Sequence, residues 1–128
     1  MILDTSAVIA VVFREKRHKQ LEEALADADS LAISAPTLLE TAMVATGAFD
    51  QRGQELVIQF LADRGVKVIP FDSRHCRTAA NAFSRYGKGR HPAGLNYGDC
   101  IAYAAASVAG EPLLFVGNDF ARTDIAPA

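Results

Sequence analysis

The sequence has few of the residues that build disulfide frameworks or zinc sites. Its 128 residues include only two cysteines, Cys76 and Cys100, and three histidines. The cysteines form no C-x-x-C pair and the histidines lack the spacing of zinc ligands, which argues against a structural zinc site. We expect both thiols to stay reduced, as is usual in the cytoplasm.

Long apolar runs and a basic leader are also missing. No apolar stretch approaches the ~20 residues that a membrane span needs, and the first residues, MILD, lack the cationic start of a secretory signal. We therefore expect a cytoplasmic protein without a membrane partner. Half of the residues are apolar, too many for a disordered chain, and the length suits a single domain over residues 1–128.

Familiar catalytic motifs are absent as well. The Gly-Lys-Gly at residues 87–89 is not embedded in a P-loop pattern, and the chain contains no G-x-S-x-G elbow. Cys100 lies in an apolar helical pattern, which favours a core residue over a nucleophile. Asp72 follows a predicted strand as in phosphate-accepting signalling domains, but the lysine that such domains need after their last strands is missing.

Cations and acids are spread unevenly along a chain of net charge −2. Residues 73–98 hold five cations and no acid, so the rest of the chain carries a net charge of −7. The whole molecule is therefore not a basic nucleic-acid-coating protein. The basic segment could still present a patch to RNA phosphates through Arg85, Lys88 and Arg90. The alternative is a solvated helix face and loop.

Four short apolar segments alternate with helical patterns. The predicted strands are residues 1–4, 31–34, 66–71 and 112–116, and residues 122–128 could add a short fifth. The predicted helices are residues 7–13, 16–27, 36–47, 51–64, 73–86 and 99–108, the first of them capped by Thr5 and Ser6. Strands separated by helices predict parallel pairing, with helices on both faces of the sheet. The predicted fold class is α/β, a three-layer α/β/α domain with a mainly parallel four- to five-stranded sheet.

Four acidic residues fall where they can meet at one edge of this sheet. Ligands bind outside the carboxyl ends of strands in such folds, and Asp4 and Asp119 follow the first and fourth strands. Asp99 begins the helix before the fourth strand, and Glu40 lies one turn into the helix after the second. Each acid sits among apolar or small residues, where an unpaired carboxylate is unfavourable. Taken singly, each could instead be a helix cap, a solvated residue or a turn residue.

A divalent cation would relieve the repulsion among these acids. No lysine or arginine adjoins them in the sequence except Arg122, near Asp119. Crowded carboxylates raise one another's pKa, and all-oxygen sites suit Mg²⁺ or Mn²⁺. The sequence therefore predicts a metal site built from Asp4, Glu40, Asp99 and Asp119.

The segments that carry the acids resemble those of the PIN-domain family, and especially the VapC-type toxins of bacterial toxin–antitoxin pairs. The matching segments are MILDTSAVIA, the glutamate of TLLE, LNYGDCIAYA and LLFVGNDFARTDI, in order along essentially the whole chain. The resemblance implies a PIN-like fold and an Mg²⁺- or Mn²⁺-dependent endoribonuclease. It makes Asp4, Glu40, Asp99 and Asp119 the catalytic and metal-binding acids.

The resemblance also implies supporting residues around the four acids. Ser6 supplies the hydroxyl after the first acid, and Asn96 and Asn118 stand in motif positions that hold the acids or a water. Asp124 is an alternative to Asp119 as the fourth acid, because the C-terminal motif can be aligned either way.

The partners implied by the resemblance are RNA, tRNA among the candidates, and a cognate antitoxin that places a basic side chain among the acids. A homodimer is also implied. Residues 7–13 and 37–48 could supply the antitoxin groove or be ordinary core helices. Related toxins often have lysine or threonine where Val116 stands, so no side-chain polar contact is expected there. The alternative function is a catalytically inactive PIN-like module that binds RNA or protein, and the number of metal ions, one or two, stays open.

Overall fold

The four strands are short and form one parallel sheet. In the computed structural model, which describes residues 1–128, the strand order is β3-β2-β1-β4 and every pairing is parallel. The sheet confirms the four predicted strands, although each is shorter than its apolar run. The strands are β1 (Ile2–Leu3), β2 (Ala32–Ser34), β3 (Lys67–Ile69) and β4 (Leu113–Leu114).

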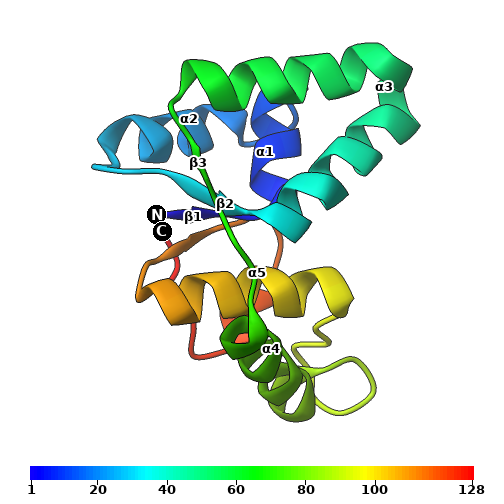
Figure 1. Ribbon diagram of the computed structural model, residues 1–128, viewed down its shortest axis with the longest axis vertical. Helices are drawn as coiled ribbons and strands as arrows, with labels where there is room; N and C mark the ends of the chain where they lie inside the picture. Colours follow the sequence, from blue (N-terminus) through cyan, green and yellow to red (C-terminus); the bar gives the residue numbers. More distant parts are fainter.

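Helices cover both faces of the sheet and complete three layers, as predicted. Figure 1 shows α1, α2 and α3 on one face, and α4 and α5 on the other. No helix combines the length and the apolar character that crossing a bilayer requires. The helices are α1 (Thr5–Val12), α2 (His18–Asp27), α3 (Ala35–Asp63), α4 (Ser73–Tyr86), α5 (Tyr97–Ala109) and the short 3₁₀ helix η1 (Phe120–Arg122).

The neighbouring strands β1 and β4 face two separate apolar cores. Leu3 and Leu114 belong to the core shared with α1, α2 and α3, whereas Ile2 and Leu113 belong to the core shared with α4 and α5. All four side chains are almost fully buried. Because both faces are covered, both residues of each strand must be apolar, which explains why the sequence shows no alternation there.

The sequence predicts two helices, residues 36–47 and 51–64, with a break between them. The structure has a kink inside the single helix α3 at this break. Phe49 and Asp50 leave the helical region, with φ +50° at Asp50. Gly53 allows the second arm to approach the first, since a Cβ there would lie 2.3 Å from the Ala45 carbonyl oxygen. Phe49 stacks on Phe13 with 4.5 Å between ring centroids, which anchors the elbow to the end of α1.

Two local predictions were wrong. The first helix begins at Thr5 and its N-cap is Asp4, not Thr5 or Ser6, because the Asp4 carboxylate accepts the Ser6 N–H. The C-terminal tail forms no fifth strand but a single parallel bridge between Leu113 and Pro127. The Leu113 N–H donates to the Ala126 carbonyl and the Ala128 N–H donates to the Leu113 carbonyl. The bridge therefore needs no N–H from Pro127, which a proline lacks.

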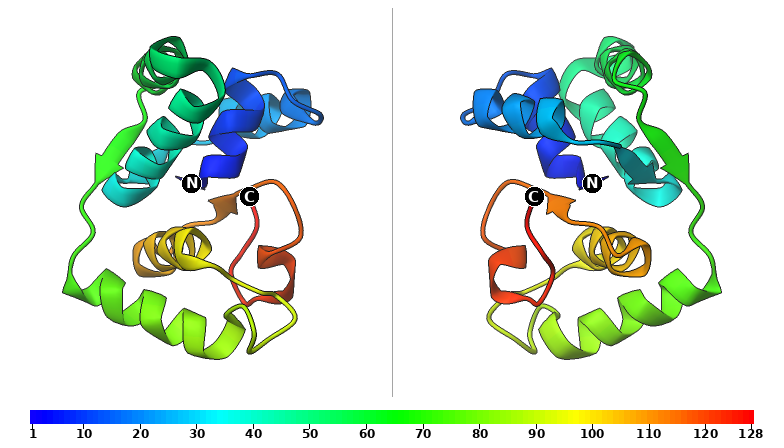
Figure 2. Two further views of the ribbon diagram at one scale, coloured as in Figure 1. Left: turned by 90° about the vertical axis from the view of Figure 1, so that its right-hand side faces the viewer. Right: turned by 90° about the vertical axis from the view of Figure 1, so that its left-hand side faces the viewer.

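The strand order places a topological switch point between β1 and β4. The connections after β1 and β2 lie on one face of the sheet, and the connection from β3 to β4 lies on the other. The direction of the strand order therefore switches between the neighbouring strands β1 and β4. Open α/β sheets bind ligands at the carboxyl ends of strands at such a point. Figure 2 shows the two helical layers and the C-terminal segment with η1 beside α5. Asp4 follows β1 directly, and the loop after β4 leads to Asp119.

Candidate active site

Asp4 is a buried acid at the end of β1. It is 6% exposed, and one of its oxygens accepts both the backbone N–H (3.0 Å) and the hydroxyl (2.5 Å) of Ser6. Burial raises the pKa of Asp4 above its usual value, and the negative charge of Glu40 raises it further, against the bonds from Ser6 that lower it. A buried carboxylate that repels its neighbour favours a cation at this position.

Ser6 joins Asp4 to the loop after β4. Its hydroxyl oxygen accepts the backbone N–H of Val116 at 2.9 Å while its proton goes to Asp4. The bond from position 116 to Ser6 is therefore made by the backbone and does not use the valine side chain. Ser6 thus has a positioning geometry, between the first acid and the segment that carries Asp119.

Glu40 lies between the segments that carry Asp4 and Asp99. One of its oxygens accepts the Thr5 hydroxyl at 3.2 Å. Its carboxylate also packs on Gly98, where an added Cβ would lie 2.7 and 2.8 Å from the two oxygens. Glycine at this position therefore lets Glu40 approach the start of α5, one residue before Asp99.

A chain of hydrogen-bonded, buried hydroxyl groups leads to Glu40 through Thr5. The Thr5 and Thr41 hydroxyl oxygens are 3.0 Å apart, Thr41 donates to the Thr37 carbonyl at 2.8 Å, and Ser34 bonds Thr37 at 2.8 Å. No buried side-chain nitrogen or oxygen in the protein lacks a partner. Sequence reasoning missed these hydroxyl groups, although the spacing of Thr37 and Thr41 places both on the face of α3 that carries neither Leu39 nor Met43.

Asp99 is fixed at the start of α5 by a reciprocal cap. Asn96 accepts the Asp99 N–H at 2.9 Å, and Asp99 accepts the Asn96 N–H at 3.0 Å. Burial raises the pKa of Asp99 to about 6, with further increases from the charges of Asp119 and Asp4 and an opposing effect of the bond from Asn96. Asn96 therefore holds the acid through the backbone cap.

The C-terminal acids have different surroundings. Asp119 is exposed at the start of η1 and its side chain caps nothing, yet its charge acts on Asp99. Asp124 accepts the Tyr103 hydroxyl at 2.6 Å and the Arg85 guanidinium at 3.3 Å, and the bond from Tyr103 chiefly lowers its pKa. The structure thus places Asp119 close enough to act on Asp99, whereas Asp124 is paired with Arg85 and Tyr103. Asn118 is exposed beside Asp119.

The chemistry of the four acids fits a hard divalent cation. None of the ion pairs in the protein includes Asp4, Glu40, Asp99 or Asp119. All four offer oxygen ligands, and their mutual repulsion is offset by no lysine or arginine. No three of the histidine, cysteine, aspartate and glutamate side chains lie close enough together to hold one metal ion in this arrangement. The acids act on one another in pairs: Glu40 on Asp4, and Asp4 and Asp119 on Asp99.

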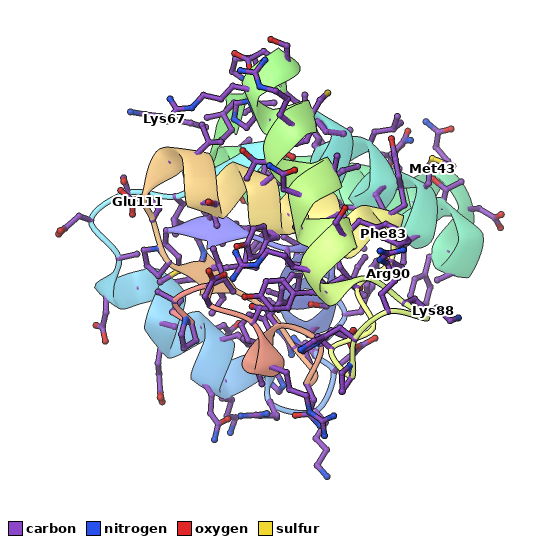
Figure 3. The ribbon with its side chains drawn as sticks, turned by 90° about the horizontal axis from the view of Figure 1, so that it is seen from below. Met43, Lys67, Phe83, Lys88, Arg90 and Glu111 are labelled. Carbon is purple, nitrogen blue, oxygen red and sulfur yellow. The ribbon has the colours of Figure 1, made fainter.

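The three cations predicted to contact RNA phosphates differ in how many of their side-chain groups are already bonded within the protein. Arg85 bonds Asp124 and the Tyr86 hydroxyl (2.7 Å), and Arg90 Nε donates to the Ser84 carbonyl at 3.3 Å. No side-chain hydrogen bond or ion pair holds the exposed Lys88. Figure 3 shows Lys88 and Arg90 at one end of the molecule, close to Phe83 of α4. Lys88 is thus the most available cation of the three.

Comparisons with known proteins agree with the fold and identify the family. The PIN domain family model matches residues 1–126. Ribonuclease VapC36 of Mycobacterium tuberculosis is 44% identical over 126 residues, which covers 98% of this chain and 91% of the relative. The crystal structure of Mycobacterium tuberculosis VapC20, a sarcin-ricin loop cleaving toxin, superposes with a TM-score of 0.80 at 17% identity, over 99% of this chain and 97% of that one. VapBC-1 from nontypeable Haemophilus influenzae gives a TM-score of 0.76 at 22% identity, over 99% and 95%. The chain therefore belongs to the PIN-domain family, among the VapC ribonucleases.

Proposed function

We propose that this protein is a metal-dependent endoribonuclease that hydrolyses phosphodiester bonds in RNA and acts as the toxin of a toxin–antitoxin pair. The observation that carries the proposal is the approach of Asp4, Glu40 and Asp99 at the carboxyl edge of the sheet with no cation to neutralise them. The curated relative at 44% identity bears the name of a ribonuclease.

Each acid has a role in this proposal. Asp4 and Asp99 would anchor an Mg²⁺ or Mn²⁺ ion, and Glu40 and Asp119 would complete or buffer the site. When bound, such an ion supplies positive charge that lowers the pKa of a water and stabilises a phosphate undergoing attack. Ser6 and Asn96 keep Asp4 and Asp99 in position through the bonds described above.

The acids alone would repel the RNA backbone, so the chain needs cations beside them. The segment of residues 73–98 carries five cations and no acid. Lys88 and Arg90 would hold phosphates that flank the cleaved bond, with Arg85 contributing from its contact with Asp124. The position and availability of Lys88 support this arrangement.

Protein partners complete the proposal. A solved structure with the same fold is a VapBC protein, and we propose that a cognate antitoxin inhibits this chain by covering the acidic edge. We also propose a homodimer, since both arms of α3 carry exposed apolar side chains, among them Leu39 and Met43 on the first arm and Ile58 on the second.

Cleavage of total RNA by the purified protein tests the proposal. We expect discrete fragments with Mg²⁺ or Mn²⁺ and none with EDTA. Asp99→Asn should reduce cleavage by at least about 100-fold, because even outer-shell partners of a metal site cost 10–100-fold. Asp27→Asn, at the exposed end of α2, is the matched control and should cleave normally.

Two results would contradict the proposal. A folded Asp99→Asn protein that still cleaves would remove this site assignment. A wild-type protein that binds RNA but leaves it uncut with either metal would favour the alternative function, an inactive PIN-like module that binds RNA.

A further inference from the structure

Thr5 carries a buried hydroxyl at a position where the helix does not need one. It is the first residue of α1 and is 8% exposed, but the side chain that caps this helix is that of Asp4. A buried hydroxyl costs free energy unless it is hydrogen-bonded, and valine would fill nearly the same volume without that requirement. The groups that the hydroxyl bonds therefore indicate its role.

The Thr5 hydroxyl donates to the Glu40 carboxylate. Its oxygen lies 3.2 Å from one Glu40 oxygen, 3.0 Å from the Thr41 hydroxyl oxygen and 3.5 Å from the Thr37 carbonyl oxygen. A threonine has one hydroxyl proton, and a bond to an ionised carboxylate is stronger than a bond to a neutral oxygen. The proton therefore goes to Glu40, and this bond joins α1 to α3.

No other group bonds the Glu40 carboxylate. Thr5 is its one hydrogen-bond donor, and no ion pair includes it. Gly98 gives the carboxylate room at the start of α5 but offers no bond to it. Because a glutamate side chain loses much rotamer freedom when it is fixed, the carboxylate would leave this position readily without the bond from Thr5.

Thr5 is in turn held by α3. Thr41 is fully buried, and its hydroxyl, beside that of Thr5, also donates to the Thr37 carbonyl at 2.8 Å. Asp4 adjoins Thr5 in the sequence, and Glu40 adjoins Thr41. The contacts of the Thr5 hydroxyl therefore set how the start of α1 and the first turns of α3 are spaced at the two acids.

We propose that Thr5 is a positioning residue of the candidate active site, whose hydroxyl, anchored on Thr41, holds the Glu40 carboxylate where it shares a divalent cation with Asp4 and Asp99. The inference rests on the proposed function and deepens it, because it assigns the placement of an acid of α3 to a residue of α1. Thr5 itself touches neither the cation nor RNA. Loss of its hydroxyl should weaken metal binding although all four acids remain.

Mn²⁺ binding, measured by isothermal titration calorimetry without RNA, gives the first test. Thr5→Val should raise the Kd about tenfold, as loss of an outer partner of a metal ligand does. Thr5→Ser keeps the hydroxyl and should retain the wild-type Kd. Thr5→Ala should match valine, and it replaces that variant if valine prevents folding. Thr78→Val is the matched control, because it removes a threonine hydroxyl that donates to the Arg74 carbonyl in α4, which carries none of the four acids.

A second test uses the metal-free protein. A Cβ at Gly98 would lie 2.7 Å from a Glu40 oxygen, a contact that costs little if the carboxylate can move aside. In the wild-type protein Thr5 restrains the carboxylate, so Gly98→Ala should lower the melting temperature in EDTA. In the Thr5→Val protein the same substitution should lower it less, or raise it, because alanine is a better helix former than glycine.

The outcomes separate the role of Thr5 from the nuclease itself. If Thr5→Val binds Mn²⁺ as tightly as Thr5→Ser, or if Gly98→Ala shifts the melting temperature equally in both backgrounds, Thr5 does not position Glu40 and the inference is wrong. Metal-dependent cleavage by the wild-type protein would then still support the proposed function. If the wild-type protein neither binds Mn²⁺ nor cuts RNA, the proposed function fails and the role of Thr5 in it fails as well.

Discussion

At the residue scale, the site consists of acids whose burial and mutual repulsion oppose ionisation. Asp4 and Asp99 both have raised pKa values, with burial as the first cause and neighbouring acids as a further one. Their hydrogen bonds from Ser6 and Asn96 offset part of this effect. The protein therefore holds these carboxylates in place at an electrostatic cost that a bound cation would remove.

The stability of the ion-free protein should consequently depend on Asp99. Its pKa is about 6 in the folded state against about 4 in the unfolded chain. The folded state therefore binds more protons between these values, and the Asp99 contribution to stability is lost as pH rises from about 4 to about 6. In EDTA, Asp99→Asn should melt at a higher temperature than wild type at pH 7.5, and the difference should shrink toward pH 4.5.

Comparing the two proteins at each pH isolates this residue from the other titrating groups. Thermal melts followed by circular dichroism provide the measurement. Melting curves that keep a constant separation across this range would contradict the raised pKa.

The two C-terminal acids give a second test at this scale. Asp119 acts on Asp99 through its charge, whereas Asp124 is held by Tyr103 and Arg85. Asp119→Asn should lower cleavage by about 100-fold or more with little change in melting temperature. Asp124→Asn should keep cleavage within a few-fold and destabilise the fold by about 1 kcal/mol. The reverse pattern would make Asp124 the fourth acid.

At the scale of elements, the start of a helix sets the position of each acid. α1 starts at its cap Asp4, α5 starts at Asn96 with Asp99 in its first turn, and α3 brings Glu40 to Gly98. The kink at Phe49 and Asp50 then folds the second arm of α3 back without disturbing the first. The acids thus depend on the helix starts, and the elbow lies away from them.

Two glycines in α3 should respond oppositely to alanine. A Cβ at Gly53 would lie 2.3 Å from the Ala45 carbonyl oxygen, whereas one at Gly47 would meet nothing within 4 Å. Gly53→Ala should lower the free energy of unfolding by about 1–3 kcal/mol, and Gly47→Ala should raise it by about 0.5–1 kcal/mol. Urea denaturation measures both, and equal effects would show that the elbow does not require glycine.

At the scale of the whole molecule, the acids come from two layers that have separate cores. Asp4 and Glu40 belong to the layer of α1 and α3, and Asp99 belongs to α5 on the opposite face of the sheet. A cation held by both sets would therefore join the two layers. Metal binding should stabilise the entire fold rather than one loop.

Addition of Mn²⁺ should accordingly raise the melting temperature of the wild-type protein in a concentration-dependent manner. A Mn²⁺ concentration 100 times the Kd corresponds to about 2.7 kcal/mol of stabilisation. Asp99→Asn should lose most of the increase, and Asp124→Asn should keep it. An equal increase in all three proteins would indicate binding elsewhere on the acidic surface.

The sequence by itself determined the four strands, their parallel α/β arrangement and the edge where the acids meet. Apolar runs without alternation require cover on both faces, and the carboxyl ends of parallel strands lie together, so these features follow from local pattern and general topology. The wrong predictions were local ones, the cap of the first helix and the fifth strand.

Only the tertiary structure decided which distant groups touch. The Ser6 link to Val116, the pairing of Asp124 with Arg85 and Tyr103, and the Glu40 contact with Gly98 join residues far apart in the chain. No periodicity encodes such contacts, because each depends on the packing of two elements against a third. The 83% exposure of the Tyr97 side chain has the same origin, since a sequence pattern shows an aromatic residue but not whether other residues cover it.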